Sequence, residues 1–248
     1  MHGIYSEVFA VALIFTLAGL VKGVMGMGLP TVAMGLLGAL MTPAEAAAFL
    51  IIPSLVTNVW QFLSGQHHMV LVRRMWPMLL MIGFVTWAGA GLITGAGAGE
   101  ASVWLGIALI AYAVIGFAKI HLSVTRRHEV WLSPTVGAAT GLVTSATGVF
   151  VIPAVPYLQA LGLEKDDLVQ ALGLSFTVST IALAAGLASH GALQIAAAGT
   201  STLCVVPALA GMGIGQIVRA RVDRATFRLV FLIGLLLLGG DLIVRSII

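Results

Sequence analysis

Charged side chains are scarce in this sequence. Only 8% of its residues are charged, whereas 60% are hydrophobic, and the mean hydropathy is +1.10. A soluble domain carries about a quarter charged residues, so this chain could not cover a water-facing surface. The apolar stretches are too long and too continuous for the alternating strands of an outer-membrane barrel. The composition therefore predicts an all-α, polytopic membrane protein.

Several kinds of functional motif are also missing. Cys204 is the only cysteine, which excludes an intramolecular disulfide. The sequence holds no Ser/His/Asp arrangement, no strong metal-ligand spacing and no G-x-x-x-x-G-K-[ST] phosphate loop. We therefore expect no enzyme, no cofactor or metal site, and no ATP hydrolysis by the chain itself. The 12 basic residues, against 9 acidic ones, indicate membrane topology rather than nucleic-acid binding.

Long apolar segments dominate what is present. A spanning helix needs about 20 residues, and six segments are long enough: 44–64, 75–96, 101–120, 167–188, 191–217 and 227–247. Four shorter segments form two pairs, 8–22 with 30–41 and 133–147 with 149–161. The start of the chain lacks the positive charge of a signal peptide, so we expect the first segment to remain. Whether each short pair crosses fully or re-enters stays open.

The two halves of the chain resemble each other. Shifting the numbering by 122 aligns "GLV" at 19–21 with "GLV" at 141–143, Glu45 with Asp167, and His68 with His190, without a gap. This similarity predicts a first membrane repeat at 1–120, a cytoplasmic linker at 121–132 and a second repeat at 133–248. Each repeat would hold a broken or re-entrant helical hairpin followed by three spanning helices.

Basic residues indicate that the second repeat is inverted. If each short pair returns to its starting side, the second half has the opposite orientation. One face of the membrane then collects ten of the 12 basic residues. A topology of eight simple crossings would instead divide them almost evenly between the two faces. The ten are Arg73, Arg74, Lys119, Arg126, Arg127, Lys165, Arg219, Arg221, Arg224 and Arg228. Inverted repeats with discontinuous helices are typical of transporters, whose substrate site lies near the midplane.

The first break, "GLVKGVMGMGLP" at 19–30, predicts an anion site. Backbone N–H groups at a hairpin tip inside the membrane need protein or ligand partners. The N–H groups of Gly26, Met27 and Gly28 precede Pro30 at the start of a half-helix, where the helix dipole favours anions. Lys22 adds a positive charge that a membrane segment tolerates when it faces a cavity or an anion. Close packing of glycines and a lysine that reaches the membrane surface are the alternatives.

Further polar residues complete the predicted substrate site. The second break supplies hydroxyl and N–H donors, so that the two half-helix starts would form one anion cradle. Polar residues also follow one face of the 44–64 segment and occur in its counterpart. Bonding of hydroxyls to their own helix and contacts between helices are the alternatives. Beyond those of the first break, the predicted residues are Ser54, Asn58, Gln61, Thr144, Ser145, Thr147, Gly148, Ser175 and Ser179.

These features resemble the TauE/SafE family of sulfite exporters over about residues 8 to 245. The resemblance lies in the size, the two similar halves, the glycine-rich break followed by proline near the start of each half, and the polar helix "SLVTNVWQ" at 54–61. It implies export, or less often uptake, of sulfite, organosulfonates and related small anions. The break "GVMGMGLP" is sparser in glycine than the family's usual "GxGGG…P", and the second break is rich in hydroxyls. The anion therefore stays open.

The sequence thus predicts a secondary transporter or facilitator that exports a small oxyanion, such as sulfite or an organosulfonate. The alternatives are an anion channel or an uptake permease for a sulfonate or carboxylate. The expected location is the inner (cytoplasmic) membrane, with multiple passes. The expected partners are the anionic substrate and membrane lipid, not nucleic acid, and homo-oligomer formation stays open.

Overall fold

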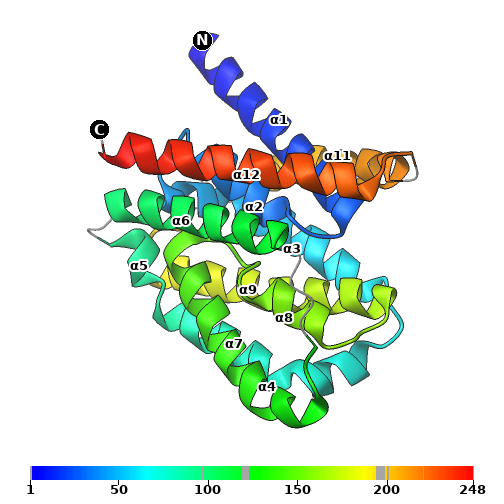
Figure 1. The fold of residues 1–248 in the computed structure, drawn as a ribbon. Coiled ribbons are helices and arrows are strands. Elements are labelled where there is room, and N and C mark those ends of the chain that lie inside the picture. The colour runs from blue at the N-terminus through cyan, green and yellow to red at the C-terminus, as the bar shows by residue number, and fades with distance from the viewer. Residues whose placement is uncertain are drawn as a thin grey trace.

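The computed structural model describes residues 2–95, 98–118, 123–193, 199, 201–219 and 221–247, and these residues form helices and no strand (Figure 1). The first half holds α1 (His2–Met25), α2 (Leu29–Gly38), α3 (Pro43–Leu63), α4 (His68–Ala88), α5 (Gly91–Thr94) and α6 (Ala98–Phe117). The second half holds α7 (Arg126–Thr147), α8 (Ala154–Ala160), α9 (Lys165–Ser189), α11 (Val205–Val218) and α12 (Arg224–Ile247).

Within the described ranges, seven helical segments are long and apolar enough to cross a membrane. The six spans predicted from the sequence are among them, and the seventh is Val8–Met25 in α1. The prediction that four segments are short is therefore correct only for α2 and α8, with 10 and 7 residues. The helix α7 has 22 residues, because residues 126–132 of the predicted linker form its first turns. Linker residues 121 and 122, and Lys119, lie outside the described residues.

The helices pack in pairs that join the two halves of the chain. The main pairs are α1 with α11, α4 with α7, α6 with α12, and α3 with α9 (Figure 1). The α3–α9 pair runs antiparallel, because Gln61 contacts Val169 while the earlier Ser54 contacts the later Thr180. The core of the molecule thus lies between the halves, and the polar face of α3 is enclosed in it.

Local sequence explains where the discontinuous segments begin. The helix α2 starts with Leu29 and Pro30, after Gly28 in the left-handed conformation at φ 103°. Proline fits the first turn of a helix because its missing N–H would be unpaired there. The helix α3 starts with a capping box, in which Thr42 and Glu45 satisfy each other's backbone N–H groups. Glu45 therefore has a local structural role.

Glycines bring α1 and α11 into close contact. A Cβ on Gly19 would lie 2.1 Å from the carbonyl oxygen of Ala208, and one on Gly211 would lie 2.0 Å from that of Thr16. No real Cβ contact is this short, so only glycine permits this separation of the helices. Small residues at helix interfaces allow such approach in membranes. Gly19 is therefore a packing residue, whereas Gly26 and Gly28 form the break.

We expect Gly211→Ala to destabilise the protein and Gly213→Ala to leave it unchanged or slightly more stable. The first substitution forces α1 and α11 apart, and overpacking of this kind costs about 1–3 kcal/mol. The second places a methyl group in open space on the same helix, where alanine favours helix by about 0.5–1 kcal/mol. Thermal unfolding of the purified protein in detergent measures both. Equal midpoints for the two variants would contradict the close-contact interpretation.

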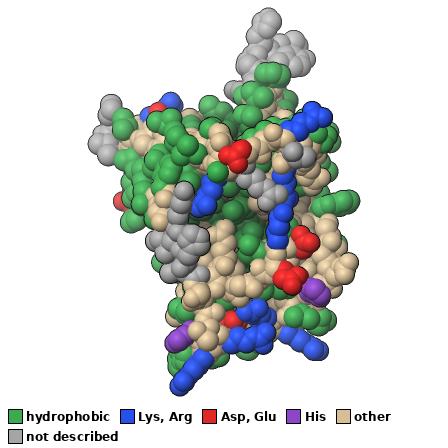
Figure 2. Space-filling view, turned by 45° about the vertical axis from the view of Figure 1, so that its right-hand side comes forward, with side chains coloured by type: hydrophobic (Ala, Val, Ile, Leu, Met, Phe, Trp, Pro, Cys, Tyr) green, Lys and Arg blue, Asp and Glu red, His purple; other side chains and the backbone are tan. Residues whose placement is uncertain are grey.

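Several of the described cations gather at one end of the bundle. Arg74 at the start of α4 pairs with Glu129 on α7 at 2.6 Å. Arg228 at the start of α12 donates to the carbonyl of Gly116, at the end of α6, at 2.8 Å. Figure 2 shows Lys and Arg side chains on this face. We call it the basic end, and it is defined by Arg74, Lys165, Arg219 and Arg228.

Candidate functional site

Lys22, near the end of α1, is the one charged side chain that is buried among the described residues, with 3% exposed. Its Nζ donates to Thr57 Oγ1 at 3.1 Å and to Asn58 Oδ1, both on α3. Both acceptors are neutral, and no described carboxylate lies within ion-pair distance of Lys22. An ammonium group has three donors. One donor and the whole positive charge therefore remain for a ligand.

A polar face of α3 surrounds the lysine. Asn58 Nδ2 donates to Ser54 Oγ at 2.9 Å, and Ser54 Oγ lies 3.2 Å from Thr180 Oγ1 on α9. These contacts form a buried polar chain from α1 through α3 to α9. The sequence pattern identified three members of the face and missed Thr57, although the spacing i, i+3, i+4, i+7 includes it. The four residues of the face are Ser54, Thr57, Asn58 and Gln61.

Pro53 interrupts the hydrogen bonding of α3 next to this face. Proline has no N–H, so the carbonyl of Phe49, one turn earlier, loses its helical donor. The buried Ser201 hydroxyl donates to that carbonyl at 2.7 Å and accepts from the Ile52 N–H at 3.3 Å. A residue of the second half thus satisfies the opened backbone of the first half beside Ser54.

The first break lies beside the polar face. Gly26 and Gly28 have φ values of 78° and 103°, which glycine adopts without strain. The Gly26 N–H donates to the Lys22 carbonyl at 2.7 Å, so its predicted role as a free anion donor is wrong. The Gly26 carbonyl accepts from Gln61 Nε2 at 2.9 Å, and the same Gln61 nitrogen donates to the Val169 carbonyl at 2.7 Å. Gln61 therefore fastens the break to α9.

Met27 packs next to aromatic groups rather than into the polar face. Its Sδ accepts a hydrogen bond from the Tyr112 hydroxyl at 3.6 Å. Gly28 packs near Phe231, whose ring would lie 3.5 Å from an added Cβ. Of the predicted residues in this break, Lys22 contacts the polar face directly through its side chain, and Gly26 does so through its carbonyl.

Three buried hydroxyl groups have no hydrogen-bond partner among the described residues: Thr31, Thr140 and Ser175. Thr31 lies in the first turn of α2, directly after the break. An unpaired buried donor costs about 1–3 kcal/mol. Such groups gain most from a polar ligand. Thr31 directly follows the "GLP" of the first break in the sequence, and it is not among the predicted site residues.

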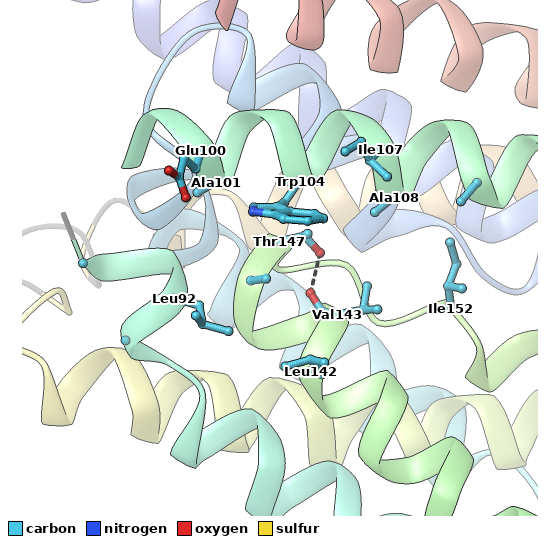
Figure 3. A pocket seen from close by; sticks show the side chains of 14 residues that line it. Leu92, Glu100, Ala101, Trp104, Ile107, Ala108, Leu142, Val143, Thr147 and Ile152 are labelled. Carbon is cyan, nitrogen blue, oxygen red and sulfur yellow. Dashed lines mark hydrogen bonds between the residues drawn. The ribbon is translucent and has the colours of Figure 1, made fainter. Parts of the chain in front are cut away.

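The second break differs from the prediction. The hydroxyls of Thr144, Ser145 and Thr147 donate to carbonyls of their own helix at 2.7, 2.8 and 2.6 Å. Figure 3 shows Thr147 bonded back to Val143 beside an apolar cavity of about 590 Å³. These hydroxyl protons are therefore used within α7. The lining of this cavity includes Trp104, Ile107, Leu142 and Ile152.

The two breaks have different neighbours in the bundle. The first is bonded through Gln61 to Val169, near the start of α9. The second lies near the end of α4, where a Cβ on Gly89 would be 2.5 Å from Ser145 Oγ. Gly148 packs on Met34 of α2. The single cradle of two facing half-helix starts stays a prediction, and the side-chain hydrogen bonds described above gather around Lys22.

The predicted serines of α9 have different environments. Ser179 Oγ donates to the carbonyl of Ser175 at 3.1 Å, so its proton is used locally. Ser175 Oγ is buried without a partner among the described residues. Thr180, which the prediction of site residues omitted, contacts Ser54. On α9, Ser175 and Thr180 are therefore the stronger candidates for the site.

The histidine and carboxylate groups indicate no metal centre in the described part of the chain. No cluster of three or more His, Cys, Asp or Glu residues that could hold an ion occurs there. His67, in the turn before α4, lies 2.7 Å from Asp167 Oδ1 at the start of α9. This hydrogen bond and the carboxylate charge raise the pKa of His67 above its ordinary value. The pair joins the two halves at the basic end.

Comparison with known proteins identifies the family of the chain. Residues 11–242 match the family model described as sulfite exporter TauE/SafE. No curated protein and no solved structure matches the chain. The match covers nearly the whole chain, including the break, the polar face of α3 and nearly all of the predicted spans. The chain belongs to the sulfite exporter TauE/SafE family, a family of membrane transporters rather than enzymes.

Proposed function

We propose that this protein exports a small sulfur oxyanion, such as sulfite or an organosulfonate, across the cytoplasmic membrane. The observation that carries the proposal is the buried Lys22, which is bonded to neutral oxygens and has no described carboxylate partner. An isolated buried charge is costly unless a counter-charge is present. A transported anion supplies that counter-charge, and the family match supports a sulfite-like anion.

Within the site, Lys22 supplies charge and Asn58 orients the lysine. The Asn58 Oδ1 accepts a hydrogen bond from Lys22 Nζ, and the Asn58 Nδ2 donates one to Ser54 Oγ, which orients the amide. We assign Thr31 and Ser175, two of the buried hydroxyls without a described partner, as donors to the anion oxygens. Hydrogen bonds to charged groups are worth about 1.5–3 kcal/mol each. A few such donors therefore suffice for a weak, reversible site, which a transporter needs.

The substrate is tested by flux into proteoliposomes loaded with unlabelled anion. We expect labelled sulfite or a sulfonate such as taurine to accumulate by exchange, with saturable kinetics. Acetate, included as a carboxylate control, should compete poorly. Flux that does not saturate would favour a channel. Preference for acetate over every sulfur oxyanion would contradict the proposed substrate class.

The proposed mechanism uses two inverted halves that enclose the site. Under the shift of 122, α3 and α9 are counterparts, and they run antiparallel in contact with each other. Under the same shift, α1 corresponds to α7, and α4 corresponds to residues 190–210, which include the start of α11. The α1–α11 pair is therefore the counterpart of the α7–α4 pair. This arrangement supports alternating access by movement of one half against the other around a fixed site.

The topology prediction follows from this arrangement. We expect positions 73, 126 and 221 to face the cytoplasm and both termini to face away from it, because ten of the 12 basic residues then obey the positive-inside rule. Single cysteines at these positions, in a Cys204→Ala background, are probed with an impermeant thiol reagent on intact cells. Labelling of position 73 from outside, or opposite locations for the two termini, would contradict the inverted repeat.

A further inference from the structure

A small cavity lined by cations lies at the basic end. Its volume is about 220 Å³, and it is enclosed by the end of α1, the start of α9, and residues of α8 and α12 and the end of α11. Three cations line it, together with the amide of Gln159: Lys165, Arg219 and Arg228. No acidic residue occurs among its described lining residues. We call this cavity the basic vestibule.

The charges of the basic vestibule are poorly compensated. Arg228 donates to the Gly116 carbonyl at 2.8 Å, which is a neutral partner. Among the described residues, Lys165 and Arg219 make no ion pair. Cations that face one cavity repel each other, and a cleft lined by one sign of charge concentrates the opposite ion. An oxyanion bound there would relieve the repulsion.

The basic vestibule adjoins the Lys22 site. Its wall includes Met25, Met27 and Val169. Gln61 bonds to the carbonyls of Gly26 and Val169 directly beside this wall. Lys22 lies one helical turn before Gly26, since the Gly26 N–H donates to its carbonyl. The Gln61 contacts thus lie between the vestibule and the buried lysine.

We propose that the basic vestibule is a second anion site, which captures the oxyanion before it passes Gln61 and reaches Lys22. The capture role rests on the proposed function, whereas the anion site itself does not. The cavity is smaller than the roughly 300–1,000 Å³ typical of drug-sized ligands, so it suits a small sulfonate, sulfite or phosphate group. The same chemistry occurs in the headgroup of an anionic lipid, and the test separates the two sources.

The first measurement reports the electrostatic potential in the vestibule without any transport. Gln159→Cys in a Cys204→Ala background places one thiol on the vestibule lining. Its reaction rate is compared for two methanethiosulfonates, the anionic sulfonatoethyl reagent and the cationic trimethylammonioethyl reagent. We expect Lys165→Gln with Arg219→Gln to lower the anion-to-cation rate ratio by roughly 16- to 80-fold. Coulomb's law over roughly 8 Å of water changes each rate two- to threefold per charge, and the two charges act on the two rates in opposite directions.

The matched control is Arg73→Gln, which removes a cation at the same end but outside the lining. We expect it to change the ratio less than twofold, because Arg73 is exposed and lies outside the lining, where solvent and salt screen its charge. A ratio that is unchanged by the Lys165 and Arg219 substitutions, or equally changed by Arg73→Gln, would overturn the proposal.

The second measurement identifies the ligand. Lys22→Met protein that carries Gln159→Cys is placed in nanodiscs of phosphatidylcholine with or without phosphatidylglycerol. We measure whether methanesulfonate slows the reaction of the introduced thiol with the sulfonatoethyl reagent, that is, whether it protects the thiol. Protection that occurs in both lipids supports a free-oxyanion site, and it requires no transport activity. Protection by phosphatidylglycerol alone would assign the vestibule to a lipid headgroup and overturn its role in substrate capture. Absence of protection in every arm would overturn the anion site, even if sulfite transport is demonstrated.

Discussion

Lys22→Met is expected to abolish or greatly weaken transport while the protein still folds. The variant removes the one buried charge of the described structure and at least one charge-assisted hydrogen bond to the anion. Such a bond is worth about 1.5–3 kcal/mol, which corresponds to roughly 10- to 100-fold in affinity. The measurement is exchange of labelled sulfite in proteoliposomes, with half-saturation and maximal rate determined separately.

Stability separates this effect from misfolding. Burying an unpaired charge costs several kcal/mol, so removing it in Lys22→Met should leave the unfolding temperature at or above that of the wild type. Arg245→Met is the control, because Arg245 is exposed and pairs with Asp241 far from the polar face. Wild-type flux in Lys22→Met would mean that the lysine is structural and that the anion binds elsewhere.

The second large effect is the response of export to the membrane potential. Moving one negative charge out of a negative interior is favoured by about 2.3 kcal/mol per 100 mV. A dianion gains about twice that, enough for a gradient of more than about 1,000-fold. We therefore expect anion efflux from proteoliposomes to follow a potassium–valinomycin potential, with no need for ATP or a pH gradient.

Asp241 provides the decisive variant for this prediction. The described structure contains no buried carboxylate, and Asp241 is partly exposed and paired with Arg245 at 2.8 Å. Asp241→Asn should therefore retain potential-driven efflux. Flux that ignores the potential and follows a pH gradient would contradict uncoupled export. Loss of this pH-driven flux in Asp241→Asn would then identify Asp241 as a proton carrier.

The sequence predicted the helical membrane fold because composition and segment length determine it. Six spans follow directly from apolar runs longer than the membrane thickness. The lengths of α1 and α7 were underestimated because their ends are glycine-rich or polar. Tertiary contacts, not hydropathy, extend these helices, as in the Arg74–Glu129 pair that joins α7 to α4.

The candidate site was predictable where it depends on helical periodicity. Ser54, Asn58 and Gln61 share a face of α3, and the structure brings this face to Lys22. The second break was not predictable in the same way, because a hydroxyl that bonds to its own helix has the same sequence signal as one that faces a ligand. The depth of each break also depends on helix packing, which a single sequence does not display.

The central claim is that the polar cluster around Lys22 binds the transported anion, and equilibrium binding tests it most directly. A ligand that binds only the folded state stabilises it, by about 2.7 kcal/mol at 100 times the dissociation constant. Thermal unfolding of the purified protein is therefore measured over a range of sulfite concentrations for the wild type and Lys22→Met. The account predicts a saturable rise in the wild-type midpoint that moves to at least about tenfold higher sulfite in the variant. Identical sulfite dependence in both proteins would contradict it.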